Sequence, residues 1–189
     1  MYELYQTKRG SRGSAAEVWI DKEKRLVKKY YKPNGITITG GVPLHNTLEE
    51  LKQLYEAEVF WTSCYPDFTL EIYEHGSLQT EQGFYVLQEY GGDDLLHQIG
   101  KTVKRKDVPN FSEQIVEMFR QFKDKDMYKL NSALCNMVYD TKSKKVKAID
   151  FKYSKVREER LREFEIYSVT EWVSSIDPNL PALIIGELV

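Results

Sequence analysis

Two side chains with oxygen ligands flank a short polar turn in the second half of the chain. Asn136 precedes an apolar stretch at 137–139, and Asp150 follows another at 146–149. Apolar runs joined by a polar turn predict a β-hairpin, with the carboxamide before its first strand and the carboxylate after its second. Mg²⁺ prefers hard oxygen ligands and takes few of them from protein when it also binds nucleotide phosphates. The pattern is therefore typical of a Mg²⁺–nucleotide site.

A lysine within an apolar strand offers a second charge suited to phosphate. Residues 25–31 are rich in β-forming side chains and contain Lys28 and Lys29 side by side. Neighbouring residues in a strand point to opposite faces, so only one of the two lysines faces inward. A lysine that faces inward needs an anionic partner.

The elements that must position these residues can be predicted from periodicity. A glycine-bearing loop at 7–13 precedes a strand at 18–20, and Thr47 with Glu50 forms a capping-box pattern at the start of a helix that should end near Cys64. The remaining predicted elements are strands at 68–73 and 84–90 and helices at 94–99, 112–125 and 164–175.

The order of these elements resembles the protein-kinase-like fold over most of the chain, from about Gly10 to Ser175. Asp150-Phe151-Lys152 resembles the metal-binding Asp-Phe-Gly of that family, with lysine in place of glycine. The resemblance implies an α+β, two-lobed fold, with a β-rich N-lobe at 1–90 and a truncated, mostly helical C-lobe at 91–189. It also implies that ATP binds with Mg²⁺ between the lobes, and that Asn136 and Asp150 hold the metal.

The resemblance assigns further nucleotide-binding residues in the first half of the chain. It implies that Lys28 holds the phosphates and that Glu56, on the first predicted helix, positions Lys28, with Lys29 as the alternative lysine. Glu58 is expected to point elsewhere, because it lies about 200° from Glu56 around the helix. The other residues implied are Ser11, Gly13 and Val18 in and after the phosphate-covering loop, Gln88 in the gatekeeper place, Glu89 and Tyr90 as hinge backbone, and Asp94 near the ribose.

One departure from the family pattern bears on catalysis. Where the family keeps its catalytic aspartate, this chain has Asn131, whose carboxamide does not accept a proton as a carboxylate does. The segment after Asp150 is also short, as in the stripped-down kinases of bacterial effectors and phages. We therefore expect a pseudokinase or weak kinase that acts through a partner protein. The alternatives are an active minimal phosphotransferase with a displaced base, of which Asp126 is the better candidate, and an interaction module that binds no nucleotide.

The amino-acid composition limits the environments and partners expected for the protein. The formal net charge of −2 gives no general attraction to nucleic acid. A charged content of 30% and the lack of a long apolar run argue against a membrane protein. Cys64 and Cys135 form no disulfide framework, and the N-terminal segment has no apolar signal-peptide core. A cytoplasmic protein is expected, either in its own cell or delivered to a host.

Overall fold

The chain divides into two compact units in the computed structural model. The first comprises Met1–Pro66 and Leu70–Tyr90, and the second Asp67–Thr69 and Gly91–Val189. Their assignment as kinase lobes remains a prediction. Within the described part of the chain, no helix is both long and apolar enough to cross a membrane. The structure describes residues 1–5, 16–33, 47–92, 110–124 and 136–151, and single positions at 179 and 182.

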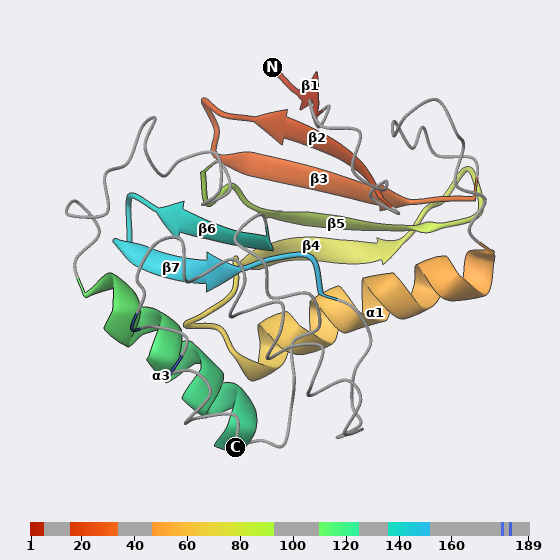
Figure 1. Cartoon of the computed structure of the whole chain (residues 1–189). Coiled ribbons are helices and arrows are strands. Elements are labelled where there is room, and N and C mark those ends of the chain that lie inside the picture. Colours follow the sequence, from red (N-terminus) through yellow and green to blue (C-terminus); the bar gives the residue numbers. More distant parts are fainter. Residues whose placement is uncertain are drawn as a thin grey trace. The chain divides into compact units, whose positions relative to one another are not determined.

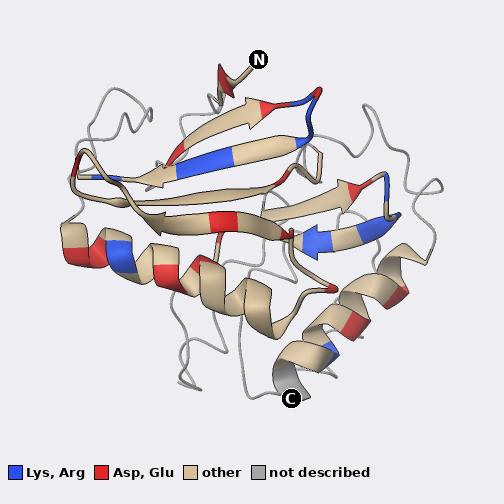
Figure 2. Cartoon of the chain, turned by 180° about the vertical axis from the view of Figure 1, so that it is seen from behind, with Lys and Arg blue, Asp and Glu red and all other residues tan. Residues whose placement is uncertain are grey.

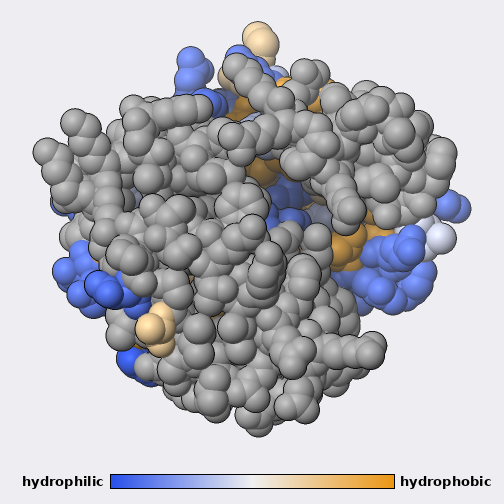
Figure 3. Space-filling view, viewed as in Figure 1, coloured by the Kyte–Doolittle hydropathy of each residue, from blue (hydrophilic) through white to orange (hydrophobic). Residues whose placement is uncertain are grey.

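The first unit is built on an antiparallel five-stranded sheet with the strand order β1-β2-β3-β5-β4 (Figure 1). Its helix and strands confirm the α+β class predicted from the sequence. The surface seen in Figure 3 is mostly hydrophilic where described residues are visible, with smaller apolar areas. The strands are β1 (Glu3–Leu4), β2 (Glu17–Asp21), β3 (Leu26–Tyr31), β4 (Ile72–Ser77) and β5 (Phe84–Glu89).

The β2–β3 hairpin fixes which side chains of β3 share a face. Asp21 ends β2 and accepts a hydrogen bond from the Lys24 N–H at 3.1 Å, and Arg25 adopts a left-handed conformation with φ of 55°. The resulting register places Val18 opposite Lys29. Paired residues in an antiparallel sheet lie on the same face, so Val18 and Lys29 are neighbours on one side of the sheet.

Helix α1 (Leu48–Cys64) packs on the sheet and contacts β3, β4 and β5. Leu51 on the helix joins Tyr31 of β3 and Val86 of β5 in one buried cluster. Tyr31 and Lys29 are two residues apart in β3, so they share the face of the sheet that α1 covers. The helix thus determines which of the two adjacent lysines lies on the covered face of the sheet.

The start of α1 confirms the predicted capping box. The Glu50 N–H donates to Thr47 Oγ1 at 3.2 Å, and the Thr47 N–H donates to Glu50 Oε2 at 2.8 Å. This second bond, from the backbone of Thr47, lowers the pKa of the Glu50 carboxyl. The stabilisation from Glu50 is therefore complete at neutral pH and declines as the pH falls through its folded-state pKa.

Replacing Thr47 with Ala should lower the free energy of unfolding by about 1 kcal/mol, because it removes the side-chain half of the cap. Urea denaturation at pH 7 measures the change. Ser63→Ala is a matched control, since the exposed Ser63 hydroxyl donates only to the Phe60 carbonyl of its own helix, and it should alter stability by less than about 0.5 kcal/mol. Equal losses from the two substitutions would contradict a stabilising cap at Thr47.

The second unit contains the hairpin predicted around Asn136, formed by β6 (Met137–Asp140) and β7 (Lys145–Ala148). The Asp140 carboxylate accepts hydrogen bonds from the N–H groups of Lys142 and Ser143, at 3.1 and 3.0 Å, and so holds the turn. Helix α3 (Phe111–Asp124) contacts β7. The side chains predicted to share one face of this helix are all buried, namely Ile115, Met118, Phe119 and Phe122.

A segment from the first half of the sequence completes this hairpin. The Ala148 N–H donates to the Phe68 carbonyl at 2.7 Å, and Thr69 forms a parallel bridge with Ala148. The predicted strand at 68–73 is therefore wrong in its extent. Residues 67–69 belong to the second unit, whereas β4 of the first unit begins at Ile72.

Candidate functional site

A largely buried ion pair links the sheet to α1 in the first unit. Lys29 Nζ lies 2.6 Å from Glu58 Oε1, and the two side chains are only 12% and 4% exposed. The Tyr31 hydroxyl lies 3.4 Å from the second carboxylate oxygen of Glu58. Figure 2 shows the basic stretch of β3 in the middle of the sheet. A lysine held in this way on an apolar face is a fixed cation with N–H groups left for a further anion.

The predicted pairing of Lys28 with Glu56 is wrong, because the two side chains have other partners. Lys28 Nζ lies over the ring of Tyr2, 4.8 Å from its centroid, on the face of the sheet opposite Lys29. Glu56 is 46% exposed and pairs with Lys52 one helical turn away, at 3.8 Å. Lys29, the alternative in the sequence analysis, is the lysine that reaches a helix glutamate, and that glutamate is Glu58.

The sequence does contain a signal for Glu58. Glu58 lies seven residues after Leu51 and three before Trp61, so these positions recur on one stripe of a helix. All three side chains are buried in the structure. A glutamate on the apolar stripe of a helix requires a cation or hydrogen-bond donors, because an unpaired buried charge is costly.

The end of β5 carries the residues predicted to meet a nucleotide base. The Glu89 N–H donates to the Glu71 carbonyl at 2.8 Å, and the Tyr90 N–H donates to the Arg25 carbonyl at 2.9 Å. Both backbone donors are therefore used within the protein. Gln88 precedes them and is buried. Its side chain lies on the same face of the sheet as Lys29, because the register pairs Gln88 with Val27.

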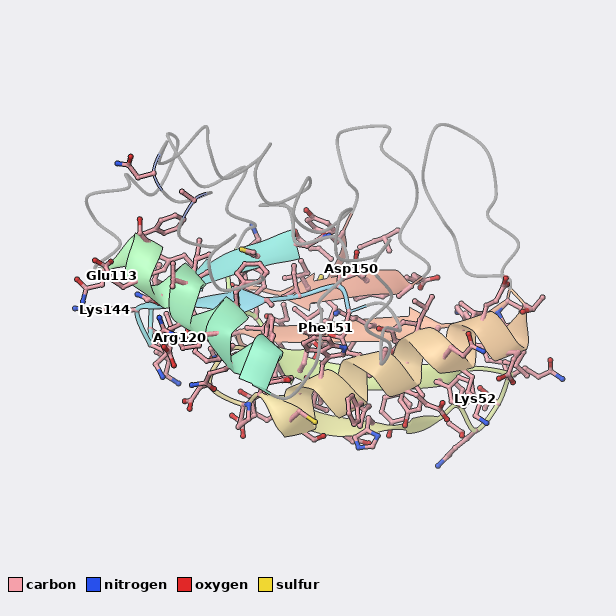
Figure 4. All side chains as sticks on the ribbon, turned by 60° about the horizontal axis from the view of Figure 1, so that its bottom comes forward. Lys52, Glu113, Arg120, Lys144, Asp150 and Phe151 are labelled. Atoms are coloured by element: carbon pink, nitrogen blue, oxygen red, sulfur yellow. The ribbon has the colours of Figure 1, made fainter. Side chains whose placement is uncertain are left out.

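The hairpin of the second unit brings the backbone of its two flanking segments together. The Ile149 N–H donates to the Asn136 carbonyl at 2.9 Å, so the backbone pairing continues one step beyond β6 and β7. Asn136 is buried, whereas the next residue after Ile149, Asp150, is exposed. Figure 4 shows Asp150 and the buried Phe151 beyond the end of β7.

Asp150 has a left-handed backbone conformation, with φ of 58°. This conformation is uncommon for residues other than glycine, although Asp and Asn adopt it more readily than most. It turns the chain sharply between the exposed Asp150 and the buried Phe151. Backbone strain of this kind is often found at functional sites.

The donor set at this hairpin suits Mg²⁺ bound together with phosphates. One carboxylate and one carboxamide are few ligands for a metal held by protein alone, and no cluster of three or more His, Cys, Asp or Glu occurs among the described residues. Mg²⁺ characteristically binds one or two carboxylates and completes its shell with water and substrate phosphates. Asn136 and Asp150 fit that use.

The other predicted site residues lie outside the described residues. They are Ser11, Gly13, Asp94, Asp126 and Asn131, and the predicted helices at 94–99 and 164–175 also lie there.

The antiparallel sheet with a helix bound through a buried Lys–Glu pair, and the hairpin flanked by Asn and Asp, suit a kinase-like fold. Comparison with solved structures supports that class. Two crystal structures of WbdD, one of them a complex with the kinase inhibitor LY294002, are similar to this chain with a TM-score of 0.59 and 13% sequence identity. At this identity the likeness concerns the fold alone.

The matched region covers 98% of this chain and 45% of the WbdD chain, so the chain spans about half the length of that protein. No family model matches the sequence, and no curated protein matches it.

Proposed function

We propose that this chain is a kinase-like protein that binds ATP together with Mg²⁺. The observation that carries the proposal is the buried pair of Lys29 and Glu58, joined at 2.6 Å. A buried ion pair seldom adds net stability over apolar residues of the same size, so its presence favours a function for the charges. In this proposal Glu58 orients the Lys29 ammonium, and Lys29 binds the phosphates of the nucleotide.

Asn136 and Asp150 would hold Mg²⁺ in the second unit. The ion, when bound with ATP, neutralises charge on the phosphate oxygens. The exposure of Asp150 and the adjacent, backbone-paired Asn136 support this assignment. WbdD, a protein of similar fold, binds a kinase inhibitor in its crystal structure, which agrees with a nucleotide-binding role for this fold.

The proposed activity is weak or absent phosphoryl transfer, with the protein acting through a partner protein. Asn131 stands where a catalytic carboxylate is expected, which favours a pseudokinase or weak kinase over an efficient enzyme. An active phosphotransferase that uses Asp126 is the first alternative. An interaction module without nucleotide is the second, and the buried charge of Lys29 argues against it.

Thermal unfolding with millimolar ATP tests the proposal. Ligand at 100 times its dissociation constant should stabilise the folded protein by about 2.7 kcal/mol, and Mg²⁺ should increase the shift. The double variant Lys29→Met/Glu58→Gln removes both buried charges and should abolish most of the shift. The matched control Lys28→Met changes the lysine on the other face and should keep it. No shift in the wild type would favour the interaction module.

Asp150→Ala tests the metal assignment in the same assay. Loss of the carboxylate should remove most of the additional shift caused by Mg²⁺, while the shift caused by ATP alone persists. Asp67→Ala is the matched control, because Asp67 is an exposed carboxylate of the same unit that pairs with Lys145. An unchanged Mg²⁺ effect in Asp150→Ala would remove Asp150 from the proposed metal site.

A further inference from the structure

Gln88 is a buried polar side chain whose carbonyl oxygen lacks a hydrogen-bond donor within the described part of the chain. The residue is 2% exposed. It lies between two other strands, paired with Val27 of β3 and with Ile72 of β4. Neither of these apolar side chains has a hydrogen-bond donor to offer the carbonyl of Gln88.

Such an arrangement has an energetic cost in the unliganded protein. A buried carbonyl without a partner forfeits the hydrogen bonds that it made to water, whereas an apolar side chain of the same size would not. Polar groups that are buried without partners in native proteins call for an explanation, and a missing ligand is one. The unpartnered carbonyl of Gln88 favours a ligand that donates a hydrogen bond to its Oε1.

The backbone next to Gln88 offers a ligand no free N–H donor among Glu89 and Tyr90. The N–H groups of Glu89 and Tyr90 already donate to Glu71 and Arg25. At this end of β5, the side chain of Gln88 provides a hydrogen-bond acceptor. Lys29 lies on the same face of the sheet, paired with Val86, two residues before Gln88. Diagonal neighbours of this kind are about 7–8 Å apart, which long side chains can span toward one ligand.

We propose that Gln88 Oε1 accepts a hydrogen bond from the exocyclic amino group of the bound purine, so that this residue selects adenine. The inference rests on the proposed binding of ATP and adds the residue that reads the base. A purine without the amino group would leave the carbonyl of Gln88 unpaired in the complex. Loss of one such bond weakens binding by about tenfold.

The test compares ATP with purine riboside triphosphate, which lacks only the amino group. Dissociation constants are measured by isothermal titration calorimetry for the wild type and for Gln88→Met, which has a similar volume and no polar acceptor. The wild type should bind ATP about tenfold more tightly than the analogue, and the variant should bind the two equally. Leu87→Met, on the opposite face of β5, is the matched control and should keep the preference.

The unliganded variant gives a readout that does not depend on nucleotide. Gln88→Met should melt at the same temperature as the wild type or higher, because it removes the buried carbonyl. A lower melting temperature would overturn the inference by showing that the protein itself satisfies Gln88. Equal binding of both nucleotides by the wild type would also overturn it while leaving ATP binding intact. Absence of any binding would instead reject the proposed function and, with it, this inference.

Discussion

Glu58→Gln should lower the free energy of unfolding by about 3 kcal/mol, although the two side chains have almost the same shape. The substitution leaves the Lys29 ammonium buried without a carboxylate, and breaking a buried ion pair from one side costs roughly 3–5 kcal/mol. The retained carbonyl oxygen of glutamine can still accept one hydrogen bond, so the lower end of this range applies. Chemical denaturation of the wild type and the variant at pH 7 measures the difference.

Glu56→Gln is the matched control, since it makes the same chemical change two residues away on an exposed surface. Among the described residues Glu56 pairs only with Lys52, and both side chains are about half exposed, so its loss should cost less than about 0.5 kcal/mol. Adding Lys29→Met to Glu58→Gln should recover much of the lost stability by removing the stranded charge. A larger loss of stability in Glu56→Gln than in Glu58→Gln would instead support the Lys28–Glu56 pairing predicted from the sequence.

Asn131→Asp should raise phosphoryl transfer by some part of the roughly 10²–10⁴-fold that a positioned base contributes. The substitution supplies a carboxylate at the place where the kinase-like family keeps one. The prediction depends on ATP and Mg²⁺ binding as proposed. Transfer of radiolabelled phosphate to the protein itself and to a generic acceptor protein measures the change.

Asp126→Ala is the informative companion to this variant. If the wild type turns over rapidly and Asp126→Ala abolishes the activity, the chain is an active phosphotransferase with a displaced base, and the pseudokinase proposal fails. If Asn131→Asp alone gains activity, the site lost its base and kept its geometry. If no variant transfers phosphate while ATP still binds, the nucleotide serves a structural role.

Local sequence patterns predicted most of the described elements. The strong β-formers around Val18 and Val27, the capping box at Thr47 and the apolar face of α3 each gave the right element near the right place. These signals depend on neighbouring residues only, as do turns and caps. The hairpin around Asn136 was also predicted, because its polar turn separates two apolar runs.

The inward lysine was not predictable from β3 alone. Both faces of this strand carry apolar side chains, Leu26 and Tyr30 on one and Val27 and Tyr31 on the other. Alternation therefore leaves Lys28 and Lys29 equivalent until a helix covers one face. The packing of α1 on one face is a tertiary contact. It determines which lysine is covered and which glutamate that lysine pairs with.

The two edge strands were poorly predicted for a related reason: β1 was missed, and the strand predicted at 68–73 only overlaps the start of β4. β4 contains Gly76 and several exposed polar side chains, so it has little of the alternation that marks a half-buried strand. β1 has only two residues. Strands of this kind are defined by the backbone pairing that a neighbouring strand offers them, and a single sequence does not carry that information.

The pairing of residues 67–69 with β7 has a consequence for folding. The hairpin at 137–148 obtains a third backbone partner from a segment that precedes it by about seventy positions in the sequence. A fragment that begins at Gly91 would lack that segment, and the Ala148 N–H would lose its acceptor. During synthesis Phe68 and Thr69 emerge first, and they can pair with the hairpin only after it has been made. Contacts between residues so far apart in the sequence slow folding. A C-terminal product that begins at Gly91 should therefore be less stable than the same unit in the whole chain, and a peptide containing residues 67–69 should restore part of that stability.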